Sequence, residues 1–460
     1  MSYAGCLRWE APACHLKWNA PELSKVAFEG TLYSSTGFDA EQFAKLYEEQ
    51  GPAALTTLDG PFALALWDRH RKQLLLAHDP KGKRPVYYQW TEQGIAFGFS
   101  LESLRQFLQE PLEIEPLSVA KYLVYGHVPA PRTLLRGVAK LPAGHYGLWR
   151  DGRFVLRRYF DLVRKEENET PLDAWEQLQN AVRKRLSPET PAGVLLWGGA
   201  DSGLLAAAMT EETQAAVLQT FSIGFESAFP HESLRARQTA NFFGTDHHER
   251  IVKKNEIRPA LEQLARQKEE PIGDAALLSH RLLAEWARSR VSVVLSAHPV
   301  FGMPLGFSPP EISTLMRRHW EPEALYQEMR IETPEKLFLS GMPLPILHQS
   351  SRSFDLEVRL PFADCPVPPL LKTARKKKLP SAILKRTCEP ESLPDPLWLK
   401  KEMKEWMFET LHPMRLKKEG LFDPLVVQQM LREQDAGAAD HRKKLWSLLT
   451  LEWWREQWRV

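Results

Sequence analysis

The chain has 460 residues, 43% hydrophobic and 26% charged, which is an ordinary globular composition. Lys and Arg number 60 and Asp and Glu number 58, so the formal net charge of +2 argues against nucleic-acid binding. No stretch approaches the roughly 20 apolar residues of a membrane helix, and the start of the chain lacks a secretory-signal pattern. Four cysteines without a Cys-x-x-Cys pair exclude a disulfide scaffold and predict a cytoplasmic protein.

Residues 1–162 are predicted to form a mainly β domain. The apolar run 62–68 pairs with 73–77 across a polar turn, and two further hairpins are predicted, 86–90 with 95–99 and 146–149 with 154–159. The last hairpin carries an Asp-Gly turn signal at Asp151. A strand is expected over 26–33, and helices are expected over 39–50 and 119–124.

A polar linker is expected over 163–170, and a second domain over 170–460. Short apolar strands at 194–197, 221–225 and 291–296 alternate with helices at 175–186, 203–209 and 234–243, the last ending at Gly244. This alternation predicts a parallel α/β sheet. From about Pro310 onward the chain is predicted to be largely helical.

The segment 194–206 carries the clearest chemical signal, because a strand feeds the turn Gly198-Gly199 and the turn opens a helix. Backbone N–H groups at such a turn, together with the helix N-terminus, bind phosphate. Asp201 at the mouth of the turn is placed to hold Mg²⁺ between phosphates. The alternative is a tight βα turn in which Asp201 or Ser202 only caps the helix.

The segments 62–68, 76–88, 122–134 and 141–146 resemble the glutaminase-domain core of glutamine-dependent asparagine synthetases, and 221–226, 244–249, 356–362 and 445–449 resemble their synthetase domain. The resemblance implies a truncated class II glutamine amidotransferase-like β-sandwich, then an α/β domain of the ATP-pyrophosphatase type. In that family the first domain releases ammonia from glutamine, and the second adenylates a carboxylate and forms an amide. The resemblance also assigns a nucleotide site to Gly198, Gly199, Asp201, Ser202, Ser222 and Gly224.

The first domain departs from the family at its glutaminase site. The family's nucleophile is an N-terminal Cys, but Ser2 follows Met1 here, and the internal Cys6 lacks the free amine. Glu29-Gly30 stands where the family has an Asn-Gly oxyanion donor, so a carboxylate replaces a hydrogen-bond donor. Asp39 resembles the family's amine-binding Asp. No glutaminase nucleophile and no glutaminase activity are therefore expected.

The synthetase site also departs from the family. Trp197 replaces the first Ser of the Ser-Gly-Gly-x-Asp-Ser loop, and its indole is expected either to fill the pyrophosphate space or to pack beneath the sheet. His298 and Phe301 stand where the second loop carries carboxylates, which weakens a magnesium-assisted reaction. Glu357 and Lys372 are weak catalytic candidates, Glu357 with Arg359 as its alternative partner.

Our leading hypothesis from the sequence is a degenerate asparagine synthetase homologue, kept as a binding or scaffold protein. Its partners would be a second copy, an active paralogue or a biosynthetic protein. The alternative is an active ATP-dependent amide ligase that uses ATP and Mg²⁺, either an asparagine synthase or a relative of the β-lactam synthetases and lasso-peptide cyclases. The segment 303–306 loosely resembles the second loop of β-lactam synthetases. Those relatives also lack the nucleophilic Cys but keep an adenylating site.

Overall fold

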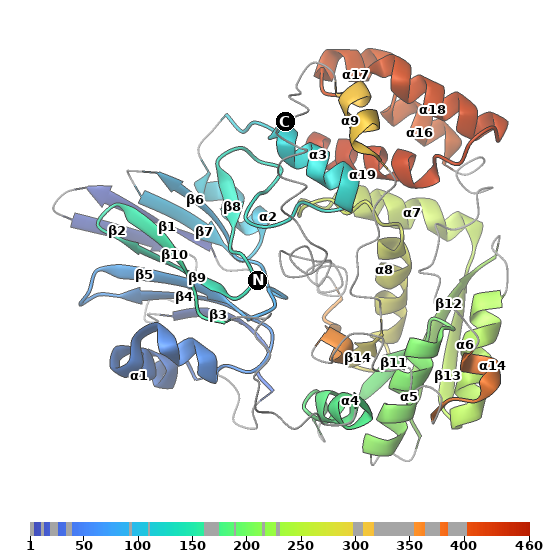
Figure 1. Ribbon diagram of the computed structural model, residues 1–460, viewed down its shortest axis with the longest axis horizontal. Helices are drawn as coiled ribbons and strands as arrows, with labels where there is room; N and C mark the ends of the chain where they lie inside the picture. Colours follow the sequence, from blue (N-terminus) through green and yellow to red (C-terminus); the bar gives the residue numbers. More distant parts are fainter. Residues whose placement is uncertain are drawn as a thin grey trace.

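The computed structural model describes residues 4–10, 13–18, 26–33, 39–91, 94–108, 111–160, 174–187, 190–213, 217–226, 231–297, 307–316, 354–363, 378–384 and 403–460. These residues form two units that lie side by side, an antiparallel β-sandwich and a parallel α/β unit with a helical C-terminal part (Figure 1). In the described part of the chain, no helix combines the length and the apolarity needed to cross a membrane. The linker predicted over 163–170 lies outside the described residues.

Two five-stranded antiparallel sheets make up the N-terminal unit. The first sheet has the order β2 (Ala13–Trp18), β1 (Ala4–Glu10), β7 (Gly94–Gly98), β6 (Tyr87–Thr91), β8 (Val138–Lys140). The second has the order β10 (Arg153–Arg158), β9 (His145–Arg150), β5 (Gln73–His78), β4 (Phe62–Asp68), β3 (Val26–Gly30). The three predicted hairpins are confirmed as β4–β5, β6–β7 and β9–β10.

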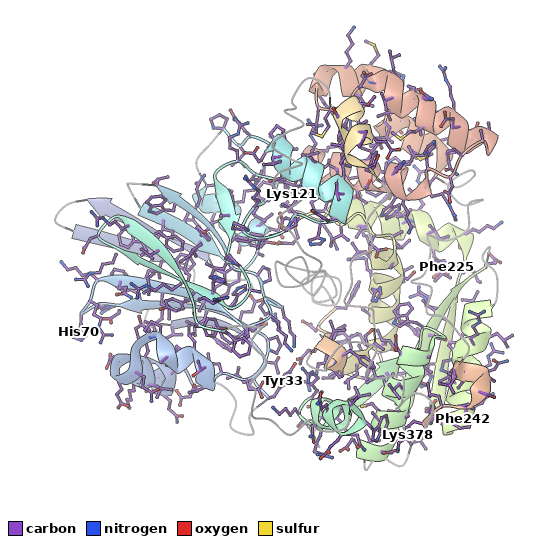
Figure 2. The ribbon with its side chains drawn as sticks, in the orientation of Figure 1. Tyr33, His70, Lys121, Phe225, Phe242 and Lys378 are labelled. Carbon is purple, nitrogen blue, oxygen red and sulfur yellow. The ribbon has the colours of Figure 1, made fainter. Side chains whose placement is uncertain are left out.

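Side chains from both sheets fill the space between them (Figure 2) and bury one face of β4, whose other face packs on helices outside the sandwich. Phe97 and Ile95 of β7 belong to the same core as Trp149 of β9 and Leu74 and Leu76 of β5. The outer face of the second sheet packs on α1 (Ala40–Gln50) and on the 3₁₀ helix η1 (Gly51–Thr57). The helices predicted at 39–50 and 119–124 are confirmed as α1 and α3 (Pro116–Tyr125).

The second unit contains the predicted parallel sheet, in the order β13 (Asp246–Val252), β12 (Gln219–Phe225), β11 (Ala192–Leu195), β14 (Val293–Ser296), β15 (Glu357–Arg359). One face packs on α4 (Ala174–Arg183), α5 (Ala200–Glu212) and α6 (His231–Phe243). The other face packs on α7 (Lys254–Ala265) and α8 (Ala276–Ala287). The helix expected over 203–209 begins earlier, at Ala200, because Gly199 takes the N-cap position.

The C-terminal helices gather beside the end of α7, above the parallel sheet in Figure 1. Their bounds are α9 (Pro309–Leu315), α16 (Lys404–Thr410), α17 (Pro413–Glu419), α18 (Pro424–Ala436) and α19 (Arg442–Trp458). The short helices η3 (Pro361–Ala363) and α14 (Ser381–Leu384) lie instead beside the parallel sheet, η3 against α4 and α14 against α5. One apolar core contains residues of α19, of α7 and α8, and of α3 from the N-terminal unit. The short helices α2 (Leu101–Leu104) and η2 (Arg105–Phe107) lie against this junction. The two units therefore share a core.

Candidate functional site

The turn between β11 and α5 has the geometry that the sequence predicts for a phosphate loop. Gly198 has a φ of +80°, a conformation that favours glycine, and Gly199 caps α5. The Ser202 hydroxyl donates to the Gly199 carbonyl (3.0 Å) and accepts from the Trp197 backbone N–H (3.3 Å). These bonds fix the turn at the positive end of a 13-residue helix, with Asp201 in its first turn.

Trp197 lies on the α8 side of the sheet. Its indole N–H donates to the Ser296 hydroxyl at the end of β14 (3.4 Å), and its ring lies 4.5 Å, centroid to centroid, from the ring of His280 on α8. The indole packs with the apolar core that contains α7 and α8, whereas α5 belongs to the core on the opposite face. Of the two placements expected for this side chain, the contacts fit packing beneath the sheet.

Ser222 and Gly224 follow on the neighbouring strand, β12. Ser222 is fully buried, and its hydroxyl lies 3.1 Å from Nε2 of His247 on β13, whose Nδ1 lies 3.0 Å from the Thr220 hydroxyl. Burial lowers the pKa of His247, so the ring is neutral at pH 7. A Cβ at Gly224 would lie 3.0 Å from the Ile251 side chain, so this position is closely packed.

His247 is a candidate site residue that the sequence analysis missed. It bridges two hydroxyls on the adjacent strand and therefore fixes the side of the candidate nucleotide site that Ser222 forms. The sequence feature that could have indicated this residue is the polar run Asp246-His247-His248-Glu249, which begins the edge strand β13. Only the parallel pairing, Thr220 with His247 and Ser222 with Glu249, brings the ring between the two hydroxyls.

Glu357 lies on β15, and both of its carboxylate oxygens accept hydrogen bonds from Arg359. The Arg359 guanidinium donates to Oε1 through Nε (3.0 Å) and to Oε2 through Nη2 (2.9 Å), a bidentate pair between residues of one strand. Arg359 also donates to the backbone carbonyl of Arg185. The alternative partner expected for Glu357 is thus present. Lys372 and the second loop with His298 and Phe301 lie outside the described residues.

In the N-terminal unit, Glu29 pairs with Arg84 at 3.0 Å, and both side chains are nearly buried, 13% and 12% exposed. The carboxylate expected to oppose an oxyanion is thus neutralised by a guanidinium. Asp39 caps α1 by accepting from the backbone N–H groups of Glu41 (2.8 Å) and Gln42 (3.1 Å). Cys6 lies on β1, as a strand residue, and Ser2 falls outside the described residues.

The described part of the chain offers few side chains that could bind a metal ion. No group of three or more His, Cys, Asp or Glu residues gathers there in a metal-binding arrangement. Asp201 is the carboxylate placed in the first turn of α5, beside the phosphate loop. Residues 198–202 fit a nucleotide phosphate chain by their backbone conformation, and Asp201 would be the ligand that they offer to its Mg²⁺.

Comparison with protein families accounts for both units. Residues 18–160 match the glutamine amidotransferase domain, and residues 174–302 and 369–456 match asparagine synthase.

The chain belongs to the asparagine synthase family.

Two relatives show how similar in sequence this chain is to other asparagine synthetases. The asparagine synthetase [glutamine-hydrolyzing] 1 of Bacillus subtilis (strain 168) is 23% identical over 516 residues, covering 91% of this chain and 81% of the relative. The asparagine synthetase [glutamine-hydrolyzing] of Cricetulus griseus is 32% identical over 243 residues, covering 50% of this chain and 42% of the relative. The match to an asparagine synthase confirms the resemblance and the two-part architecture, an antiparallel amidotransferase domain followed by an α/β ATP-pyrophosphatase domain.

Proposed function

We propose that this chain is an ATP-dependent amide-forming ligase that takes its nitrogen from ammonia or another amine, not from glutamine. A carboxylate oxygen of the substrate attacks the α-phosphorus of ATP and releases pyrophosphate. The amine nitrogen then attacks the acyl carbon and releases AMP, and an amide remains. Gly198 and Gly199 would bind the phosphates through backbone N–H groups, and Asp201 would hold the accompanying Mg²⁺.

The placement of Trp197 carries this proposal. An indole standing over the turn would exclude pyrophosphate, but this indole is bonded to Ser296 and stacked on His280, on the side of the sheet that α8 covers. The helix N-terminus that would bind the phosphate is kept, although the loop lacks the first hydroxyl of the family's pattern. Family membership supports ATP as the nucleotide.

The loss of the glutamine step is supported by the Glu29–Arg84 pair. A guanidinium-neutralised carboxylate has no N–H to donate to an oxyanion. The internal Cys6 has no free α-amine to act as its base. The amine therefore has to enter as a free molecule.

Calorimetric titration with ATP, with and without Mg²⁺, tests the proposal. We expect saturable binding that Mg²⁺ strengthens and that Asp201→Ala weakens by about tenfold, the cost of one charge-assisted contact. Asp435→Ala, at an exposed ion pair with Lys404 on α16, is the matched control and is expected to bind as the parent does. Absence of ATP binding to the parent chain would refute the proposal.

A second candidate function is a non-catalytic binding protein of the same family. It is favoured by the bidentate hold of Arg359 on Glu357, which occupies both oxygens of that carboxylate. The sequence also supports this second candidate, because His298 and Phe301 stand where the resemblance expects carboxylates. Pyrophosphate release from ATP in the presence of ammonium and aspartate, or of another carboxylate, distinguishes the two: a ligase releases it above the no-enzyme baseline, and a scaffold protein does not.

A further inference from the structure

The strand β10 forms one edge of the second sheet. In the part of the chain that the structure describes, β10 is the last strand of that sheet and pairs with β9 alone. Five of its six residues are exposed. An edge strand of this kind presents backbone N–H and C=O groups that a further strand can pair with. The edge of β10 is therefore a surface on which another chain could extend the sheet.

The hairpin geometry determines which backbone groups of β10 face outward. The two-residue turn 151–152 has a positive φ at both positions (+49° and +74°), a turn type that pairs the residues on either side of it. At the other end of the hairpin, the Tyr159 N–H donates to the Gly144 carbonyl (2.9 Å). Bonded and non-bonded pairs alternate in an antiparallel ladder, so residues 153, 155 and 157 direct their backbone groups toward β9. Residues 154, 156 and 158 direct theirs outward.

The hairpin also carries an excess of positive charge. Residues 145–160 contain four arginines and one carboxylate, Asp151, which pairs with Arg150 (3.2 Å). Arg153 and Arg157 are exposed, and neither has an acidic partner among the residues that the structure describes. Their guanidinium groups are therefore available to a carboxylate from outside the chain.

The turn 69–72 between β4 and β5 adds to this charge. Gln73 pairs with Arg150 in the register of β5 and β9, so this turn lies beside the turn of the hairpin. Figure 2 shows His70 of this turn at the end of the sheet that is remote from the α/β unit. The turn holds two arginines and one lysine, and the preceding carboxylate, Asp68, pairs with one of these arginines (3.4 Å). The positive surface is thus distant from the candidate nucleotide site.

Two exposed apolar side chains lie between the arginines of β10. Val155 is 47% exposed and Leu156 is 37% exposed, whereas Phe154 packs against the first sheet. Alternate residues of a strand share a face, so Arg153, Val155 and Arg157 form a row on one face of the sheet. An extended segment that carries a carboxylate on each side of an apolar residue, all on one face, complements this row.

A second copy of this chain does not complement the edge. Antiparallel pairing of two β10 strands centred on Val155 sets Arg153 of each copy opposite Arg157 of the other. Like charges directly opposite each other destabilise a sheet. A nucleic acid would neutralise the arginines, but it has no peptide groups to pair with the outward backbone groups. An acidic peptide segment matches the arginines, the apolar side chains and the backbone groups together.

We propose that the open edge of β10 is a docking site for an extended acidic segment of a partner protein, which adds to the second sheet as a sixth strand. Its carboxylates pair with Arg153 and Arg157, an apolar side chain covers Val155, and its backbone bonds to the outward groups of β10. The site is separate from the nucleotide site, and its test does not depend on ATP.

Fluorescence-anisotropy titration of the full chain with a labelled, capped peptide tests the proposal. The peptide Glu-Glu-Val-Val-Thr-Glu complements the charged and apolar side chains of β10 read in reverse. We expect saturable binding, and at least about tenfold weaker binding when every peptide nitrogen is methylated, because that peptide keeps its charges but has no N–H groups to donate. Exchange of glutamate for lysine in the peptide is expected to abolish binding.

The variant Arg157→Glu tests the contribution of charge, and it is expected to weaken peptide binding by about tenfold, since it turns an opposite-charge pair into a like-charge pair. Lys45→Glu is the matched control, because this lysine is exposed on α1 of the same unit but lies outside the hairpin. It is expected to bind the peptide as the parent does. An equal loss in both variants would show that only the net charge matters and would overturn the proposal.

Residue-resolved hydrogen exchange on the parent chain gives a readout that needs no variant. At a peptide concentration ten times its dissociation constant, the amides of Phe154, Leu156 and Arg158 are expected to gain about tenfold protection. The amides of Val155 and Arg157 face β9 and are expected to change little. The proposal is overturned by absence of peptide binding, by equal binding of the methylated peptide, by equal protection at all five amides, or by tighter binding of a single-stranded oligonucleotide than of the peptide.

Discussion

The ion pair Glu29–Arg84 is expected to contribute to the stability of the N-terminal unit. Both side chains are nearly buried. Removing one member of such a pair leaves a buried charge without its counter-charge. We expect Glu29→Gln to lower the free energy of unfolding by about 3 kcal/mol, read from the midpoint of urea-induced unfolding. Glutamine hydrolysis is expected to remain absent in Glu29→Asn, because the amide alone supplies no nucleophile.

The control for this prediction is the exposed pair Glu113–Arg136, whose side chains are more than half exposed. Glu113→Gln is expected to cost less than about 1 kcal/mol, since solvent screens the pair. The double variant Glu29→Met with Arg84→Met is expected to recover much of the loss, because it removes both charges. An equal cost at the two pairs would contradict the burial argument.

At the scale of single residues, the sequence located the turn between β11 and α5 but not the surroundings of its side chains. Gly198, Gly199 and Asp201 lie where the strand–turn–helix pattern predicts them, since that pattern depends on neighbouring residues alone. The direction of the Trp197 indole depends on His280 and Ser296, which come from two other elements. Local sequence therefore left two alternatives for Trp197, and tertiary packing distinguishes them.

Helix α3 of the N-terminal unit packs on α19 of the second unit. The hydroxyl of Tyr122 on α3 lies 2.7 Å from the Thr450 hydroxyl and donates to the Ser447 carbonyl (3.1 Å), and all three residues are buried. We expect Tyr122→Phe to lower the free energy of unfolding by about 1 kcal/mol, the net value of a buried hydrogen bond. Because the variant loses hydrogen bonds between the two units, we also expect the units to unfold at different temperatures. Scanning calorimetry would then show two unfolding transitions.

Tyr159→Phe is the matched control, since the Tyr159 hydroxyl donates to the His78 carbonyl inside the N-terminal unit (2.6 Å). It is expected to lose a similar amount of stability without splitting the transition. If both variants unfold with the same profile as the parent, the hydrogen bond of Tyr122 does not couple the units.

The helices and strands that could be predicted are those whose sequence pattern depends on neighbouring residues alone. The three hairpins carry apolar strands and short turns in consecutive sequence, and the structure confirms all three. The edge strand β13 was missed because its residues are mostly polar, and β15 was missed because it has only three residues and pairs with the distant β14. The apolar helix α3 was predicted, but the reason for its burial on all sides, contact with α9 and α19, lies far along the chain.

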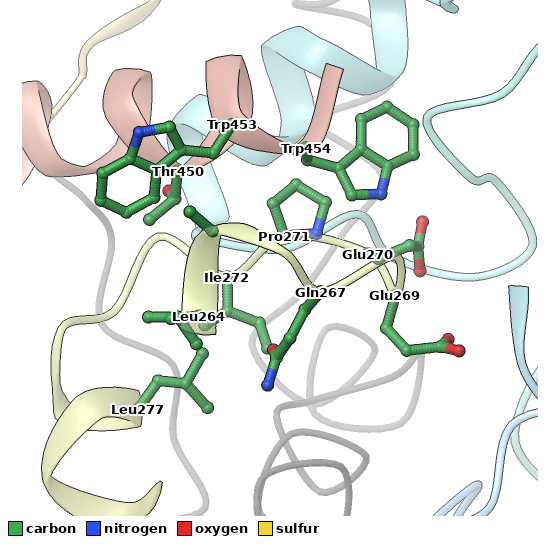
Figure 3. Close-up of a pocket in the computed structure, with 11 residues that line it drawn as sticks. Leu264, Gln267, Glu269, Glu270, Pro271, Ile272, Leu277, Thr450, Trp453 and Trp454 are labelled. Carbon is green, nitrogen blue, oxygen red and sulfur yellow. The ribbon is translucent and has the colours of Figure 1, made fainter. Parts of the chain in front are cut away.

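At the scale of the whole molecule, each unit has apolar cores of its own, and one further core contains residues of both units. Each unit therefore has an apolar surface that the other unit covers. Val119, Ala120, Leu123 and the other apolar residues of α3 belong to the same core as the tryptophans of α19. The connection between α7 and α8, which includes Glu269 and Glu270 (Figure 3), adds polar contacts at the edge of this core. The sequence predicted the two domains but not this junction, because periodicity describes single elements and not their docking.

The shared core makes a prediction for the separated halves. When the chain is divided within the linker predicted at 163–170, each half exposes an apolar surface that the other half covers in the intact molecule. Contiguous exposed apolar surface of this kind drives aggregation or association. We expect each half expressed alone to aggregate or to bind a hydrophobic dye, and the two halves expressed together to elute as one complex in gel filtration. The replacement Leu123→Asp on α3, which places a charge in this core, is expected to abolish the complex, whereas Val155→Asp on the exposed strand β10 is expected to leave it intact. Independent solubility of both halves, without association, would show that the junction contributes little to the stability of either unit.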